Sequence, residues 1–586
     1  MQTLDSSILT HLTGLYGQET GSITYERLGE LMDRYATLTP GPAPQPGKGE
    51  RNLSSGDALL ITYGDQVRQT EVAPLRTLAD FCEQRLAGVV SGVHLLPFFP
   101  YSSDDGFSVI DYRQVDPELG DWDDIARLGR SFRLMFDAVI NHISAQSEWF
   151  KRCLQDDPKY RDYFIVVEGD PDLSQVVRPR ALPLLTTFET PSGPKAVWTT
   201  FSEDQIDLNY KNPEVLLEII ATLLYYVAHG AEFIRLDAIA YLWKEIGTSS
   251  IHLPQTYRVI KLFRAVLDMV APHVFLITET NVPHEENISY FGNGSNLAQM
   301  VYNFALPPMV LHSLLTGEAA ALSRWAAGLE LPSDQVTFFN FLASHDGIGL
   351  NPARGILSPA EIDHLVETVQ DHGGLVSYKH NPDGTQSPYE LNISYFDALS
   401  DPNSGEALSV QIDRFAAAHA IMFTLVGMPG IYFHSLFGSR SWREGVAQTG
   451  RNRTINRQKF WRDELEQELD QPGSLRQQVF SRLSQLLKIR AARPAFHPTG
   501  TQRVIECSRA VFALLRSSPD AGDRVLCLQN VSDQPQAVAL DLGEITPDLS
   551  LTRGKLIDLI TGREFDHGSR LALNLEAYQA LWLPVS

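Results

Sequence analysis

The sequence predicts an α/β protein built on a (β/α)₈ barrel, and three observations support this fold class. Short apolar runs that resemble strands alternate with helical stretches from residue 58 to about residue 490. Three acids, Asp237, Glu279 and Asp346, each lie at the downstream end of such a run. The length of 586 residues accommodates a barrel of about 250 or more residues together with satellite domains. Because the carboxyl ends of barrel strands converge on one mouth, the three acids should meet there.

The first 50 residues are expected to form a helical extension followed by a linker. Apolar residues recur at helical spacing as far as residue 38, and the run PGPAPQPG at residues 40–47 breaks any regular structure. The barrel is then expected to occupy residues 51–141 and 211–495, beginning with strand-like runs at residues 58–63 and 90–96.

Two insertions and a C-terminal region with a different residue pattern complete the predicted organisation. Residues 142–210 are rich in Pro, Asp and Arg, and residues 351–400 form a second irregular stretch that contains the turn sequences DHGG and NPDG. Loops of this length are usually functional, so the second is expected to be a loop-rich insertion at the mouth of the barrel. Residues 496–586 consist of short apolar runs broken by turn residues, which predicts a C-terminal antiparallel β domain.

Composition argues against several classes of partner. The formal net charge is −23, whereas a nucleic acid or an anionic membrane would need a basic face to displace counterions. The cysteines have no zinc or disulfide spacing, which predicts free thiols in a reducing cytosol. The N-terminus lacks the stretches of a signal peptide, and no apolar run approaches the length of a membrane span. The sequence therefore predicts a cytoplasmic protein.

Five motifs occur in the order that the α-amylase family uses: HLLPFFPYSSDDGF (94–107), FDAVINH (136–142), IRLDA (234–238), ITE (277–279) and ASHD (343–346). The chain resembles this family over roughly residues 75–500. Local runs such as YNFALPP (302–308) and TINR (454–457) make it similar to the sucrose phosphorylase subfamily, which also contains phosphorylases of glucosylglycerate, glucosylglycerol and sucrose 6′-phosphate. The resemblance implies that residues 142–210 are a small B domain rimming the active site.

The resemblance implies a role for each acid. Asp237 is the nucleophile that forms a β-glucosyl-enzyme, Glu279 is the general acid and then the general base, and Asp346 steadies the oxocarbenium-like transition state. The residues themselves agree, because Arg235 shares a strand face with Asp237 and would hold that carboxylate ionised. Glu279 ends an apolar strand, and such surroundings raise the pKa of a carboxyl. Retaining geometry predicts about 5–5.5 Å between the carboxyls of Asp237 and Glu279.

A further set of residues matches positions that hold the glucosyl unit in related enzymes. Hydrogen bonds around every hydroxyl of one ring would create a blind pocket for a single glucose, which favours exo-acting chemistry over starch cleavage. Aromatic side chains would form apolar walls for the ring. The polar residues implied by the resemblance are Asp104, His142, His345 and Arg453, and the aromatic candidates are Phe107 and Tyr241.

Phosphate and the acceptor need their own contacts. An anion that enters a strongly acidic protein requires a local cationic patch, for which Arg178 and Arg180 are the candidates, and Tyr389 could add a hydroxyl donor. Asn281 stands where sucrose-cleaving relatives usually carry His, and Glu390 where they tend to carry Gln. The runs at residues 387–394 and 278–284 and the length of the chain look more like the glucosylglycerate phosphorylase branch, and sucrose remains the second candidate donor.

The resulting hypothesis is a retaining α-glucoside phosphorylase, a hexosyltransferase acting by double displacement. It would convert 2-O-α-glucosylglycerate or sucrose, with inorganic phosphate, to α-D-glucose 1-phosphate and the free acceptor. The alternatives are an exo-acting α-glucosidase or transglucosidase with the same residues, and a non-catalytic sugar-binding barrel. The proposed chemistry requires no cofactor and no metal, and the sequence contains neither a nucleotide fingerprint nor a convincing oxygen-rich calcium loop.

Overall fold

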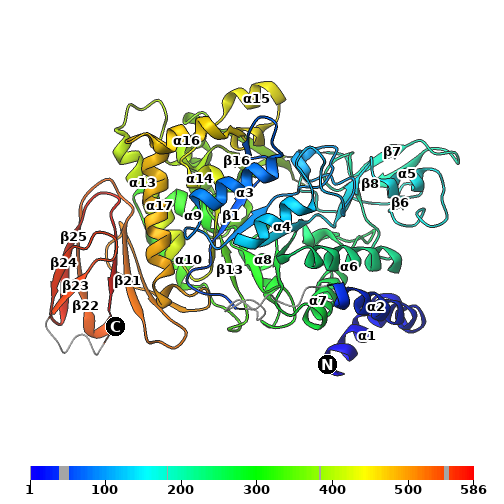
Figure 1. The fold of residues 1–586 in the computed structure, drawn as a ribbon, viewed down its shortest axis with the longest axis horizontal. Helices are drawn as coiled ribbons and strands as arrows, with labels where there is room; N and C mark the ends of the chain where they lie inside the picture. Colours follow the sequence, from blue (N-terminus) through cyan, green and yellow to red (C-terminus); the bar gives the residue numbers. More distant parts are fainter. Residues whose placement is uncertain (1, 39–51, 181, 382–384, 547–553, 586) are drawn as a thin grey trace.

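The computed structural model describes residues 2–38, 52–180, 182–381, 385–546 and 554–585. Eight parallel strands close into a barrel at its centre, in the order β1-β17-β13-β12-β11-β10-β4-β3 (Figure 1). The predicted fold class is therefore confirmed. The strands are β1 (Leu59–Thr62), β3 (Gly92–Leu95), β4 (Arg133–Ala138), β10 (Ala231–Leu236), β11 (Phe275–Thr278), β12 (Met300–Tyr302), β13 (Thr337–Asn340) and β17 (Met428–Tyr432).

The barrel strands are largely apolar because side chains on both faces of a parallel barrel are covered. Strands β11 and β13 are buried along their whole length. Asp237 directly follows β10 and Glu279 directly follows β11, at the carboxyl ends of these strands. This position places both acids at the carboxyl-end mouth.

Helices cover the outside of the barrel. Several begin with a proline in the first turn, where the missing N–H costs no hydrogen bond. The principal covering helices are α3 (Pro74–Arg85), α4 (Trp122–Ser131), α6 (Pro213–Ala228), α7 (Pro254–Val270), α9 (Leu306–Thr316), α10 (Ala320–Ala327), α13 (Leu408–Thr424) and α17 (Leu475–Ala491).

The N-terminal residues form two helices, α1 (Gln2–Tyr16) and α2 (Gln18–Leu38), which pack on α7 and α6 at the side of the barrel (Figure 1). The hydroxyl of Tyr16 donates to the carbonyl of Tyr210 at 2.9 Å, and Arg27 forms an ion pair with Glu214 in α6. Helices α6 and α7 lead into β10 and β11, so this hairpin braces the two elements that deliver Asp237 and Glu279. The predicted linker at residues 40–47 lies outside the described residues.

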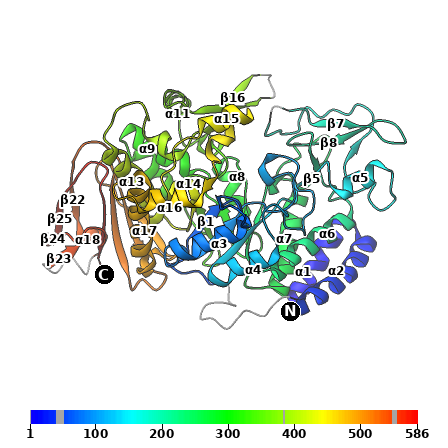
Figure 2. The same ribbon diagram turned by 45° about the horizontal axis from the view of Figure 1, so that its top comes forward.

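The insertion after β4 forms a small lobe beside the mouth (Figure 2). Strand β5 (His142–Ser144) pairs with β9 (Gln205–Asp207), and β8 (Lys195–Trp198) lies between β6 (Val166–Val167) and β7 (Leu185–Phe188). The short helix α5 (Glu148–Leu154) completes it, and Val167, Val176, Leu184 and Trp198 form its own apolar core.

Residues 351–400 contain more regular structure than the sequence suggested. Helix α11 (Pro359–Asp371) starts with a capping box between Ser358 and Glu361, and β15 (Leu375–His380) pairs with β16 (Gln386–Asn392) as a hairpin. The apolar spacing of α11, with Ile362, Leu365 and Val369 buried, is a helical signal that the surrounding turn residues obscure. Helix α12 (Tyr395–Leu399) ends the segment.

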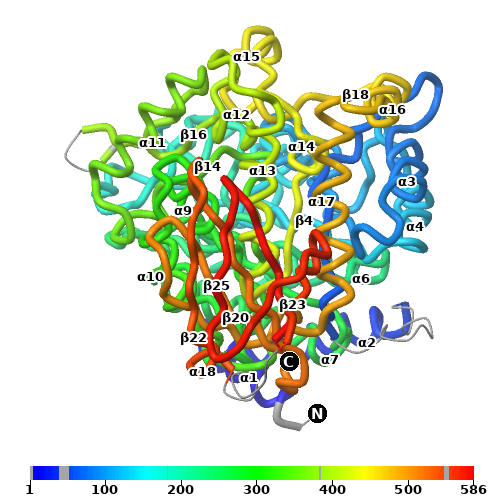
Figure 3. The backbone as a smooth tube through the Cα atoms, turned by 90° about the vertical axis from the view of Figure 1, so that its left-hand side faces the viewer, coloured from blue at the N-terminus to red at the C-terminus, as the bar shows by residue number. Residues whose placement is uncertain are grey.

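Two packed four-stranded antiparallel sheets form the C-terminal region (Figure 3). One has the order β19-β20-β21-β26 and the other β22-β25-β24-β23, and apolar residues from both make a separate core. The strands are β19 (Thr501–Val504), β20 (Val511–Ser517), β21 (Arg524–Asn530), β22 (Gln536–Asp541), β23 (Gly554–Ile557), β24 (Glu564–His567), β25 (Arg570–Leu575) and β26 (Ala580–Pro584).

Among the described residues, no helix combines the length and apolar character needed to traverse a lipid bilayer.

Leu28 of α2 is fully buried, so the hairpin should contribute measurably to stability. We expect Leu28→Ala to lower the free energy of unfolding by about 2–5 kcal/mol, because it leaves a cavity in packed apolar surroundings. Urea unfolding followed by circular dichroism measures the change. Leu38→Ala is the matched control, since Leu38 is 58% exposed and should cost no more than about 0.5 kcal/mol. Equal unfolding midpoints for the two variants would contradict the bracing role of the hairpin.

Candidate active site

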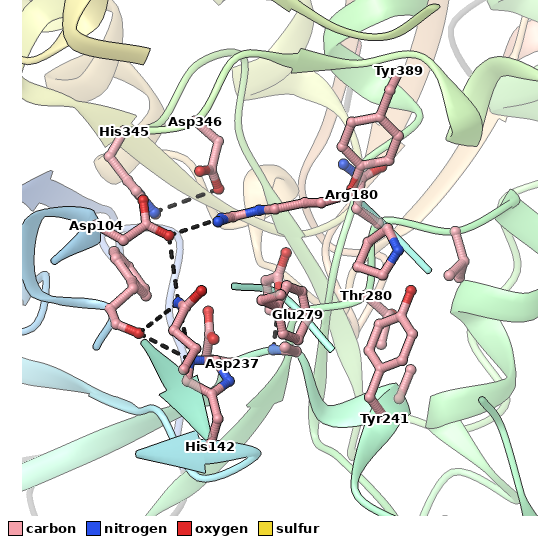
Figure 4. Close-up of a pocket in the computed structure, with 18 of the residues that line it drawn as sticks. Asp104, His142, Arg180, Asp237, Tyr241, Glu279, Thr280, His345, Asp346 and Tyr389 are labelled. Carbon is pink, nitrogen blue, oxygen red and sulfur yellow. Dashed lines mark hydrogen bonds and ion pairs between the residues drawn. The ribbon is translucent and has the colours of Figure 1, made fainter. Parts of the chain in front are cut away.

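A pocket opens at the carboxyl ends of the barrel strands (Figure 4). It combines acids, two arginines, two histidines and several aromatic side chains in one depression. Its lining residues are Asp104, Phe107, His142, Pro179, Arg180, Phe201, Gln205, Asp237, Ala238, Ala240, Tyr241, Glu279, Thr280, Asn281, Val282, His345, Asp346, Tyr389 and Arg453. The three acids that the sequence singled out therefore lie in the same pocket.

Arg235 joins the acids from beneath the pocket floor. Its Nη1 atom donates to Asp237 Oδ1 at 2.8 Å and also pairs with Asp137, while its Nη2 atom lies 3.8 Å from Glu279 Oε2. Both the arginine and Asp137 are buried. His94 Nε2 lies 2.7 Å from Asp137 Oδ2, which extends the network to strand β3. One guanidinium therefore orients both acids that the sequence pairs as nucleophile and acid/base.

The main chain next to Asp237 also holds Glu279. The N–H of Ala238 donates to Glu279 Oε2 at 3.0 Å, and Ala238 has φ +49°, a left-handed conformation that is strained for a residue with a Cβ. The predicted carboxyl separation of about 5–5.5 Å stays a prediction. These contacts hold the two carboxyls side by side on adjacent strands.

The protonation of this pair differs from the expectation that Arg235 alone would keep Asp237 ionised. Burial raises the pKa of Asp237 to about 8, Arg235 opposes that rise, and the nearby Glu279 adds to it. Burial likewise raises the pKa of Glu279, as predicted from its apolar strand. The two carboxyls therefore retain a proton between them near neutral pH. The direct bond from Arg235 favours the ionised form at Asp237 and leaves the proton on Glu279.

Asp346 lies in the opposite electrostatic environment. Arg453 Nη1 is 2.6 Å from Asp346 Oδ1, and Arg457 is 3.9 Å from the same atom. Although burial acts to raise the pKa of Asp346, Arg453 and the other cations bring it below its usual range. Burial lowers the pKa of the adjacent His345 to about 3, so its ring is neutral. Asp346 is thus a permanent negative charge facing the pocket.

The remaining residues implied for the sugar ring lie around this centre. Phe107 stacks on His345 with ring centroids 4.5 Å apart and planes at 6°, and Tyr241 lines the opposite wall (Figure 4). His142 Nε2 is 2.9 Å from the carbonyl of Phe107. Asp104 accepts from Arg180 Nη2 at 2.8 Å, and Arg180 lowers the pKa of Asp104 against the effect of burial.

The predicted acceptor residues divide between the pocket and its surroundings. Arg180, Tyr389 and Asn281 line the pocket. Arg178 is exposed, does not line it and lies 3.5 Å from the carbonyl of Leu182. In an extended strand, residues two apart point to the same face. The chain bends at Pro179 and Arg180, so the two arginines need not share a face. Glu390 is buried behind Arg453 and accepts from it at 2.7 and 3.0 Å.

Asn281 owes its position to a glycine on a distant segment. A Cβ atom on Gly349 would lie 2.8–3.1 Å from the side chain of Asn281, so only glycine permits this close approach. The Oδ1 atom of Asn281 is buried without a hydrogen-bond partner among the described residues. It is an unsatisfied acceptor in the wall of the pocket.

Sequence reasoning missed several pocket and supporting residues. Asp137 and His94 stand inside motifs that were recognised, and Arg457 ends the TINR run, so a signal existed for these three. Asp105, which pairs with Arg457, is adjacent to the predicted Asp104. Pro179, Phe201 and Gln205 had no distinguishing signal, because only the folded insertion brings them to the pocket, whereas Thr280 directly follows Glu279 and could have been named from that position.

In the described part of the chain, no cluster of three or more His, Cys, Asp or Glu side chains has the arrangement of a metal site.

Comparison with known proteins gives consistent matches. The family described as alpha amylase, catalytic domain, matches residues 87–346. A glucosylglycerate phosphorylase from Spirochaeta thermophila is 52% identical over 578 residues, which is 98% of this chain and 97% of the relative. A sucrose phosphorylase from Agrobacterium vitis is 33% identical over 466 residues, covering 75% of this chain and 88% of the relative.

Among solved structures, the crystal structure of sucrose 6F-phosphate phosphorylase from Thermoanaerobacter thermosaccharolyticum superposes with a TM-score of 0.71. It is 26% identical and covers 81% of this chain and 94% of its own.

The raised pKa values of the Asp237 and Glu279 pair predict how stability depends on pH. The folded protein keeps a proton that the unfolded chain has released above about pH 4, so the free energy of unfolding should fall as pH rises from about 4 to about 8. Asp237→Asn removes one of these two carboxyls and should flatten that slope. Denaturant titrations at several pH values measure the difference, and Glu189→Gln, at an exposed position, controls for loss of one charge. Parallel stability curves for Asp237→Asn and the unmodified protein would contradict the raised pKa.

Proposed function

Since this chain belongs to the sucrose phosphorylase subfamily of the α-amylase family, we propose that its donor is 2-O-α-glucosylglycerate. The enzyme is a retaining α-glucoside phosphorylase, a hexosyltransferase that works by double displacement. The observation that carries the mechanism is that Asp237 and Glu279 share one buried guanidinium at the base of a single pocket. The products of the proposed reaction are α-D-glucose 1-phosphate and glycerate.

In the first step, Asp237 attacks the anomeric carbon while Glu279 gives its proton to the departing oxygen of the acceptor. The bond between the anomeric carbon and the acceptor oxygen breaks, and a β-glucosyl ester of Asp237 forms. Arg235 supports this division of labour because it bonds directly to Asp237 and is 3.8 Å from Glu279. The shared proton is then held by the residue that must donate it.

In the second step, phosphate attacks the ester and Glu279, now ionised, accepts the proton of the attacking oxygen. Two inversions at one carbon retain the α configuration, so the product is the α-phosphate. Asp346 stabilises the positive charge that develops on the ring in both steps without bonding to it. Its pairing with Arg453 supports this role, because the lowered pKa keeps Asp346 charged throughout.

The sugar itself is proposed to bind among Asp104, His142, His345 and Arg453, with Phe107 and Tyr241 as walls. The stacking of Phe107 on His345 supports a rigid apolar face of the kind that packs against a sugar ring. Polar groups that converge on one ring leave no room for a longer chain, which supports exo-acting chemistry.

In the proposed site, Arg180 is the cation that binds the anionic ligands. Phosphate and the glycerate carboxylate both need a cation in an otherwise acidic protein, and Arg180 lines the pocket while Arg178 is exposed outside it. Asn281 also lines the pocket, and its side-chain amide can bond to a glycerate hydroxyl. Tyr389, whose pKa burial raises above its usual value, stays protonated and can donate. Glucosylglycerate, which carries a carboxylate, uses this set better than sucrose, which is neutral.

The described cysteines are free thiols, and this supports the proposed cytoplasmic location.

The reaction is tested with sucrose, glucosylglycerate, glucosylglycerol and sucrose 6′-phosphate, each with and without phosphate. We expect α-D-glucose 1-phosphate from glucosylglycerate at the highest kcat/KM, and a fall of about a thousandfold or more in Asp237→Asn, because the nucleophile is lost. Asp413→Asn removes a surface carboxylate and should retain full activity. Free glucose released at the same rate without phosphate would identify a glucosidase instead. A preference for sucrose would refute the proposed donor.

A pair of arginine variants tests the anion site. Arg180→Ala should lower kcat/KM for phosphate by about ten- to a hundredfold, because a charge-assisted contact to an anion is lost. Arg178→Ala, two residues away and exposed, is the matched control and should leave that value within about twofold of the unmodified enzyme. Initial rates at varied phosphate concentration measure both. Equal losses in the two variants would show that general surface charge, and no specific contact, attracts phosphate.

A further inference from the structure

Asp204 does not line the pocket, and its carboxylate accepts hydrogen bonds from three serine hydroxyls. Ser102 and Ser103 each donate to its Oδ2 atom at 2.5 Å, and Ser108 Oγ lies 2.8 Å from the same oxygen. The carbonyl of Asp204 lies 3.0 Å from Ser108 Oγ and accepts from the N–H of Ala145 at 2.9 Å. Asp204 stands directly before β9, at the return end of the insertion after β4.

The three serines bracket a strained loop that carries pocket residues. Asp104 and Asp105 have φ +55° and +50°, the left-handed region that residues with a Cβ rarely adopt. Such conformations persist only when surrounding contacts enforce them. Asp105 is held by Arg457, and the loop is closed where Ser102 N–H donates to the carbonyl of Ser108 at 3.1 Å. Asp204 supplies the carboxylate that these three serine hydroxyls share.

The residue after Asp204 acts on the same loop. Gln205 Nε2 donates to the carbonyl of Phe107 at 2.9 Å and lies 3.5 Å from Asp104 Oδ2. Asp204 and Gln205 therefore hold the loop at both its serines and its pocket-facing end. Through Asp104, the same loop contacts Arg180 in the insertion.

We propose that Asp204 is a positioning residue, which holds the Ser102–Ser108 loop so that Asp104 and Phe107 meet the glucosyl ring. The carboxylate acts through the three serine hydroxyls and does not touch the substrate. It couples the insertion to the barrel, because the loop follows β3 whereas Asp204 belongs to the segment that leads into β9. The proposal rests on the proposed binding of a glucosyl unit by Asp104.

The test compares Asp204→Asn, which keeps the shape of the side chain but removes its charge, with Glu203→Gln, the same change at the exposed neighbouring position. We expect Asp204→Asn to lower kcat/KM for the α-glucoside by about ten- to a hundredfold. Its thermal midpoint should stay near that of the control. Ser103→Ala, which removes one donor, should show a smaller loss in the same direction.

A double-mutant cycle separates positioning from a general structural role. If Asp204 acts through Asp104, then adding Asp204→Asn to Asp104→Asn should cost no more than about threefold beyond the loss caused by Asp104→Asn alone. Losses that multiply, or an Asp204→Asn variant as active as Glu203→Gln, would overturn the proposal. The affinity for D-glucose, measured by calorimetry, should fall in Asp204→Asn and gives a readout independent of turnover. If the unmodified enzyme binds glucose but makes no glucose 1-phosphate, the proposed function is refuted. The inference is then tested by the same cycle of variants, with glucose affinity as the readout.

Discussion

One buried cation organises the catalytic end of the barrel. Arg235 is almost completely buried, and a charge in that position persists only if carboxylates surround it. Asp137, Asp237 and Glu279 fulfil this requirement from strand β4 and from the ends of β10 and β11. The need to neutralise the guanidinium and the need to bring two acids to one anomeric carbon are therefore met by the same contacts. Removing Arg235 would leave these buried carboxyls without the cation that they share.

Three more arginines, each paired with carboxylates, lie around this centre. Arg453 lies between Asp346 and Glu390, Arg457 pairs with Asp105, and Arg180 pairs with Asp104. This arrangement explains how a protein with a net charge of −23 can admit phosphate. The cations are locally concentrated and already oriented by carboxylates, so an incoming anion meets preorganised donors without a reorganisation cost.

The pocket depends on segments that are far apart in the sequence. The insertion after β4 supplies Arg180 and Gln205, the segment after β13 supplies Asn281's neighbour Gly349, and the β15–β16 hairpin supplies Tyr389 and Glu390. The barrel provides the acids at its strand ends, whereas the inserted segments provide Arg180, Gln205 and Tyr389 to the pocket.

The sequence by itself determined the barrel, the three acids and Arg235, because each follows from a local pattern, an apolar strand that leads into a polar residue. The proposed glucosyl contacts come from the resemblance to the family and not from such a pattern. Tertiary structure alone decided that Arg180 and not Arg178 lines the pocket, that Glu390 binds Arg453, and that Asp204 holds the Asp104 loop. It also showed that burial outweighs Arg235 in setting the pKa of Asp237. The physical reason is that burial, strain and pairing across distant loops depend on through-space distances, which sequence spacing does not specify.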